Sequence, residues 1–126
     1  MRILILAIVI FGHVVNSAAP PQTGLVQETQ SGITVTARPL EIIEISEYHI
    51  LEVVYKNDSG HPVFIIPKIA YYYWIGIIDY SPKSLYLAPG EKGAIRIEYF
   101  GKRVGWYEIK IETKVYVLDR RLRIIK

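Results

Sequence analysis

The segment WYEIKIETKVYV, residues 106–117, alternates apolar and charged side chains more regularly than any other part of the chain. Successive side chains of a strand point to opposite faces, so this pattern predicts a strand with one buried face and one solvated face. The face expected in the core comprises Tyr107, Ile109, Ile111, Thr113, Val115 and Val117, and the other face comprises Glu108, Lys110, Glu112 and Lys114.

The same alternation recurs in shorter segments between residues 32 and 126. The expected inward residues are Ile33, Val35 and Ala37, then His49, Leu51, Val53 and Tyr55, then Ile95, Ile97 and Tyr99. Shorter strands are expected at EIIEIS and over Ser84–Leu87, and Pro67-Lys68 is expected to divide or bend the apolar run that begins at Val63. The last residues fit a strand or a short helix, and we interpret them as a strand. Short strands and frequent turn signals favour an all-β fold, a β-sandwich or barrel. We expect an immunoglobulin-like β-sandwich of about seven strands.

The N-terminus has the features of a secretory signal peptide. Met1-Arg2 gives a positive start, ILILAIVIFGHVV is an apolar block, and NSAAP supplies small residues at a cleavage zone. We expect residues 1–18 to be removed and the mature chain to begin at Ala18 or Ala19. The alternative is an uncleaved membrane anchor, but the block is shorter than the ~20 apolar residues that a spanning helix needs. The sequence therefore predicts a secreted or cell-surface protein.

The stretch from Ala18 to Gly32 is rich in Pro, Gln, Thr and Gly and has no period. It predicts a flexible leader over residues 19–31 ahead of one domain over residues 32–126. The leader could supply a strand to the exposed sheet edge of a neighbouring copy. The chain has no cysteine, so an exported domain of this size must be held by packing alone.

Charge and composition limit the kinds of molecule that the chain is expected to bind. The formal net charge is +3, and the positive excess lies in the closing residues DRRLRIIK. An exported chain rarely meets nucleic acid, so we expect a solvated strand end or contact with an anionic surface. Few Asn, Gln and Met residues together with abundant Lys and Glu resemble the composition of proteins from hot habitats.

Three motifs between Leu51 and Val115 carry a resemblance: Asn57 at a strand end, LAPGE over residues 87–91, and GWY over residues 105–107. In this order they resemble immunoglobulin-like accessory domains of exported microbial proteins, of the NEW3 and CARDB types and more distantly the BsuPI-type proteinase inhibitors. The resemblance implies a sandwich that supports, spaces or binds. Pro89-Gly90 is expected to form a tight turn, and Tyr107 is expected to bury its ring and fix a corner through its hydroxyl.

Residues that could carry chemistry are few. The chain has no cysteine nucleophile and no serine in a hydrolase setting. His49 is interpreted as a satisfied core or edge residue, and a metal site from His49, Asp58 and His61 lacks a second pair at ligand spacing. Two pairs of carboxylates could be proposed as the catalytic pair of a glycosidase, Glu44 with Glu47 and Glu108 with Glu112. We interpret them as residues of a solvated face, because a glycosidase pair needs a cleft. We therefore expect no enzyme, no cofactor and no metal.

One modification motif occurs at Asn57-Asp58-Ser59, an acceptor for N-glycosylation in an expected surface turn.

The run Tyr71-Tyr72-Tyr73-Trp74 is the other unusual feature, because four consecutive rings cannot share one face of a strand. We expect Tyr72 and Trp74 to face the core and Tyr71 and Tyr73 to form an exposed patch that binds a protein. Ordinary core and edge packing, or stacking on a sugar ring, are the alternatives.

Two functions follow from these expectations. The first is a non-enzymatic structural or interaction protein of the cell surface or envelope, such as a filament subunit, whose partner is another protein or a further copy. The alternative is a carbohydrate-binding module that uses the run from Tyr71 to Trp74 on a surface glycan. A proteinase inhibitor of the BsuPI type is weaker, because no exposed inhibitory loop is identifiable.

Overall fold

The computed structural model describes residues 2–13, 25–39, 42–71 and 75–124. These residues form ten strands: β1 (Arg2–His13), β2 (Val26–Gln30), β3 (Ile33–Ala37), β4 (Ile42–Glu44), β5 (His49–Asn57), β6 (Val63–Tyr71), β7 (Ile75–Ser81), β8 (Leu85–Leu87), β9 (Lys92–Gly101) and β10 (Gly105–Val117). The expected all-β class is confirmed, with two five-stranded sheets. No helix long and apolar enough to cross a membrane occurs in the described ranges.

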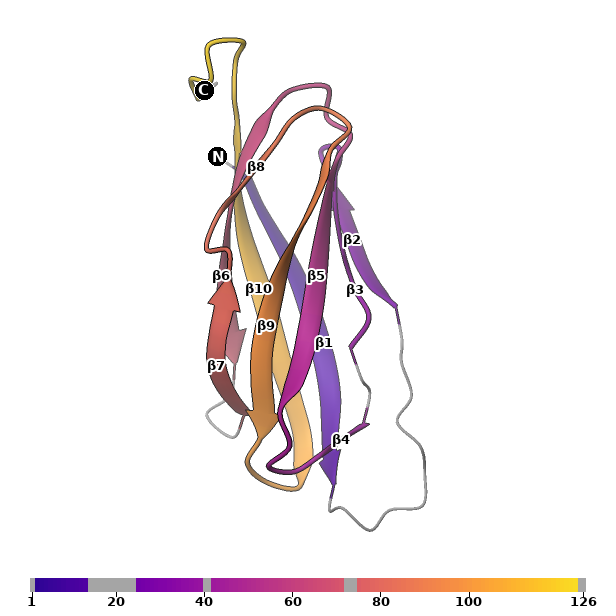
Figure 1. Cartoon of the computed structure of the whole chain (residues 1–126). Helices are drawn as coiled ribbons and strands as arrows, with labels where there is room; N and C mark the ends of the chain where they lie inside the picture. The colour runs from indigo at the N-terminus through magenta and orange to yellow at the C-terminus, as the bar shows by residue number, and fades with distance from the viewer. Residues whose placement is uncertain (1, 14–24, 40–41, 72–74, 125–126) are drawn as a thin grey trace.

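The two sheets lie face to face along one long axis (Figure 1). One has the strand order β4-β1-β10-β6-β8, and the other β2-β3-β5-β9-β7. Neighbouring strands are antiparallel except β1 and β4, which pair in parallel. Each sheet covers the apolar face of the other, which is how a chain of alternating strands removes its apolar side chains from water.

The alternation predicted the inward faces of β3, β5, β9 and β10. The predicted inward residues that are buried are Ile33, Val35, Ala37, Leu51, Val53, Tyr55, Ile95, Ile97, Tyr99, Tyr107, Ile109, Ile111, Thr113 and Val115, whereas His49 and Val117 are half-buried. A hydrogen bond of 2.7 Å between the hydroxyls of Tyr55 and Thr113 joins the two sheets inside this core. It gives both buried hydroxyls a partner, which a core must provide for polar groups.

The N-terminal segment that we expect to be a signal peptide is strand β1 in the full-length chain. It pairs with β10 from Arg2 opposite Val115 to Gly12 opposite Gly105. Its buried side chains are Leu4, Leu6, Ile8 and Ile10. Removal of residues 1–18 stays a prediction, and it would take away a strand from the interior of a sheet.

Part of the expected flexible leader is also a strand. Residues 26–30 form β2, which pairs with β3 through the turn at Ser31 and Gly32. Gly32 has a φ of +82°, a conformation that a residue with a side chain rarely adopts. Alternation did not reveal β2 because it is an edge strand whose residues after Val26 are all exposed. Residues 14–24 lie outside the described ranges.

Pro67 does not divide its strand, so the first of the two expectations for this residue is wrong, and a bend at Pro67 stays a prediction. Strand β6 continues from Val63 to Tyr71, and Pro67 lies opposite Thr113 of β10. The neighbour on the other side, β8, pairs only with Val63–Ile65. At Pro67, therefore, the side of β6 that faces away from β10 has no partner strand. On that side the missing N–H of Pro67 costs no hydrogen bond between strands.

The chain after β10 forms a turn and not a continuous strand. The Asp119 carboxylate accepts hydrogen bonds from the backbone N–H groups of Arg121 and Arg123, at 2.8 and 2.9 Å. Leu118 and Ile124 form an isolated antiparallel bridge.

Candidate interaction surfaces

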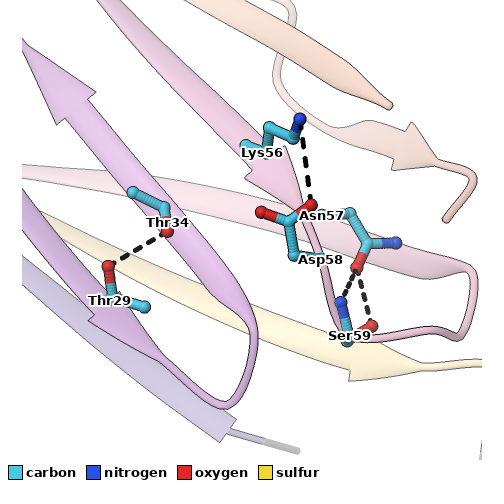
Figure 2. Close-up of polar contacts among 6 residues, drawn as sticks. All are labelled: Thr29, Thr34, Lys56, Asn57, Asp58 and Ser59. Atoms are coloured by element: carbon cyan, nitrogen blue, oxygen red, sulfur yellow. Dashed lines mark hydrogen bonds and ion pairs between the residues drawn. The ribbon is translucent and has the colours of Figure 1, made fainter. Parts of the chain in front are cut away.

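Asn57, the end of β5, joins three segments at one corner of the sandwich. Its side chain is fully buried, and its Nδ2 donates to the carbonyls of His61 (2.7 Å) and Leu87 (3.1 Å). Its Oδ1 accepts from the backbone N–H and the hydroxyl of Ser59, at 3.0 and 2.6 Å (Figure 2). Every hydrogen-bonding position of this amide side chain is therefore used inside the protein.

The backbone of Asn57 is bound as firmly to the LAPGE motif. Its N–H donates to the Glu91 carbonyl at 3.0 Å, and its carbonyl accepts from the Gly90 N–H at 2.6 Å. The Glu91 N–H donates to the Ala88 carbonyl at 3.0 Å, closing a turn with Pro89 second and Gly90 third. Gly90 has a φ of +81°, as the third position of a type II turn requires. Asn57 and Pro89-Gly90 thus form one structural unit.

This arrangement disfavours glycosylation of Asn57 in the folded chain. A glycan would replace one Nδ2–H, which donates to a carbonyl inside the protein, and would need space where the side chain is 0% exposed. The glycosylation motif is defined by three neighbouring residues alone. The burial of Asn57, in contrast, depends on its contacts with the LAPGE turn, which is distant in the sequence. Modification of Asn57 stays a prediction.

Tyr107 occupies the opposite end of the sandwich, just after the turn between β9 and β10. Its side chain is 1% exposed, and its hydroxyl accepts a hydrogen bond from the Arg103 N–H at 2.9 Å. A Cβ atom added at Gly101 would lie 3.1 Å from the ring, so the last residue of β9 packs directly on it. Ring burial and corner attachment are the structural role that the resemblance implies for this tyrosine.

Tyr71 is 47% exposed at the end of β6, whereas Tyr72, Tyr73 and Trp74 lie outside the described residues. Strict alternation from Tyr71 predicts that Ile69 lies on the same exposed face, and this prediction is wrong. Ile69 lies opposite buried Ile111 and packs against the core, because paired residues on neighbouring strands share a face. The exposure of Tyr71 comes from its position at the strand end.

A shallow hollow adjoins Tyr71, lined also by Ala70, Glu108 and Lys110. Lys110 forms an ion pair of 3.3 Å with Glu108. In the sequence, no Asp, Asn or Gln follows the aromatic run before Asp79. The pairing of Ile109 with Tyr71 supplies these two groups from β10. Tyr71 is paired with buried Ile109 and so belongs to the inward face of the sheet, whereas Glu108 and Lys110 belong to its outer face. The hollow therefore brings an exposed tyrosine and two charged residues together at the end of β6, where a polar ligand could bind.

A second polar hollow lies on the other sheet, between Ile50, Asp79, Tyr80, Ser81, Arg96 and Glu98. Lys83 bonds the Asp79 carboxylate at 2.9 Å and lies 3.5 Å from the centre of the Tyr80 ring. The hydrogen bond from Lys83 holds the pKa of the Asp79 carboxyl below its usual range. Both residues are exposed, so we interpret the group as a solvated edge.

The histidines are not brought together. His49 packs beside Tyr99 with 5.6 Å between ring centres, and its buried Nε2 has no hydrogen-bond partner among the described residues. The expectation that His49 is satisfied is therefore wrong for this nitrogen. His61 is exposed and Asp58 pairs with Lys56 at 3.8 Å. In the part of the chain that the structure describes, no three His, Cys, Asp or Glu residues are grouped as a metal site.

Comparison of the chain with protein-family models, curated proteins and solved structures finds no match.

Proposed function

We propose that this chain is an exported, non-enzymatic interaction protein of the cell surface or envelope, built on an immunoglobulin-like sandwich of the NEW3 or CARDB type. The resemblance rests on Asn57, the LAPGE segment and Tyr107. The contacts of these residues support it, since each has a structural role at a corner of the sandwich. Domains of this kind support or bind other molecules, and fold alone does not name the partner.

The observation that carries the proposal is the apolar character of both faces of β1. Its inward side chains are buried, and its outward residues Ile3, Ile5 and Val9 are 48%, 51% and 52% exposed. Their partners across the sheet are Lys114, Glu112 and Glu108 of β10. A strand with a solvated face normally places polar groups there, as β10 does. An unbroken apolar segment after a basic start is instead what secretion requires.

The first test is the N-terminus of the native protein. We expect protein recovered from the cell surface or medium to begin at Ala18 or Ala19, because the signal peptidase would cut at the small residues of NSAAP. N-terminal sequencing of the recovered protein, with the cytoplasmic fraction of the same cells as control, checks this. Surface material that begins at Met1 would contradict cleavage, and protein found only in the cytoplasm would contradict export.

A second candidate, carbohydrate binding, is favoured by the hollow beside Tyr71. We expect Tyr71→Ser to change the melting temperature by only a few degrees, because the side chain is half exposed, and to weaken binding to a glycan array at least ten-fold. Tyr86→Ser is the matched control, since Tyr86 is also 47% exposed but lies on β8. Equal glycan signals from wild type and both variants would exclude Tyr71 as a sugar platform.

A further inference from the structure

Cleavage at residue 18 would leave an open groove in the sandwich, since β1 lies between β10 and β4. The groove would expose the core side chains that now cover Leu4, Leu6, Ile8 and Ile10, and the β10 backbone groups that pair with β1. An open ladder beside an apolar core is a template for a strand from elsewhere. A replacement strand needs aliphatic side chains at every second residue and polar ones between them.

The C-terminal residues 121–124 have this pattern, with two aliphatic positions. Leu122 and Ile124 are 57% and 55% exposed, and Arg121 and Arg123 alternate with them. Leu122 has a φ of +60°, which is strained for a branched residue. Figure 1 shows this tail beyond the end of the sandwich, at the end where β1 begins. The tail therefore carries exposed apolar groups in a conformation that an extended strand would relieve.

We propose that the tail of a second copy takes the place of β1 in the exported protein, with Leu122 and Ile124 entering the groove. This rests on the proposed function, because the groove exists only after cleavage. On the outer face, one of Arg121 and Arg123 would then lie beside Glu108 or Glu112, where β1 now places Val9 and Ile5, and the other would lie beside Lys110 or Lys114. The opposite-charge pair and the like-charge pair oppose each other, so the proposal rests on the aliphatic side chains.

The chain's own tail turns back outside the stretch of β10 that would border the groove. Its bridge joins Leu118 to Ile124, whereas β10 pairs with β1 only from Gly105 to Val115. The leader is a poorer donor, because residues 26–30 already pair with β3 and Leu25 is the one large aliphatic residue between Ala19 and β2.

The test compares chains that begin at Ala19. We expect the wild-type chain to form multimers by size-exclusion chromatography with light scattering. Leu122→Ser with Ile124→Ser should lower the multimer fraction at least ten-fold. Ile78→Ser with Val104→Ser is the matched control, because these side chains are 47% and 56% exposed elsewhere, and it should assemble as wild type. A folded, monomeric wild-type chain, or a tail variant that assembles normally, would overturn the proposal.

Because the tail variant could fail to fold, a peptide experiment accompanies it. A chain of residues 19–118 should gain strand signal in circular dichroism and form a one-to-one complex with the peptide DRRLRIIK, but not with DRRSRSIK. Absence of binding to DRRLRIIK would overturn the proposal. A chain beginning at Gly32 that no longer assembles, while the tail variant does, would assign the donor strand to the leader instead. The N-terminus of native protein tests export independently of these results.

Discussion

Replacing Tyr107 with alanine is expected to lower the free energy of unfolding by about 3–5 kcal/mol, the cost of removing a buried aromatic ring. The ring is 1% exposed and packs on Gly101, and the hydroxyl holds the Arg103 N–H at 2.9 Å. The substitution would leave both a cavity and a backbone group without its partner. Urea unfolding followed by circular dichroism measures the difference, and the spectrum of the wild type should show strand and little helix.

Two further variants separate the contribution of the Tyr107 hydroxyl from that of its ring and test whether any change in this turn is destabilising. Tyr107→Phe keeps the ring and should cost about 1–2 kcal/mol, the value of one partly buried hydrogen bond. Val104→Ala, in the same turn at a side chain 56% exposed, should change stability by less than about 0.5 kcal/mol. If Tyr107→Ala unfolds within about 1 kcal/mol of wild type, Tyr107 does not fix the corner.

Much of the fold was predictable from the sequence because most strands have one face exposed to solvent and one face in the core. In β10 the charged residues Glu108 to Lys114 alternate with buried ones, so a period of two identifies both the strand and its inward side. Tyr107 was predictable for the same reason, since it begins that inward series. The short strands β4 and β8 were found as segments, because turn residues bound them.

The remaining features depend on partners that are distant in the sequence. Pro67 is tolerated because β8 ends before it, and the burial of Asn57 depends on a turn thirty residues later. The face of Ile69 is decided by its pairing with Ile111, which no local pattern in an apolar run reveals. At the candidate surface, Tyr71 could be named from composition, but Glu108 and Lys110 reach it only through the β6–β10 register.

Alkaline pH should destabilise the protein strongly through two core tyrosines. Burial raises the pKa of Tyr55 to about 12, against a smaller opposing effect of its hydrogen bond to Thr113, and burial also raises the pKa of Tyr99 to about 12. The ordinary value is about 10. Because the folded pKa is the higher one, the stabilisation is fully present below pH 10 and is lost as pH rises through 12. Each tyrosine accounts for about 3 kcal/mol and the pair for about 5 kcal/mol, a large part of the stability of a small domain.

Urea unfolding at pH 9, 10, 11 and 12 measures this loss, and single variants identify its source. Tyr99→Phe keeps the ring but cannot ionise, so the loss of stability between pH 9 and pH 12 should shrink by about 2 kcal/mol. Val104→Ala, at a side chain 56% exposed, removes no ionisable group and should leave the pH dependence as in wild type. All three chains share the general change in charge repulsion at high pH. The same pH dependence in Tyr99→Phe and wild type would show that the Tyr99 hydroxyl reaches water, contrary to the burial of this side chain in the sandwich.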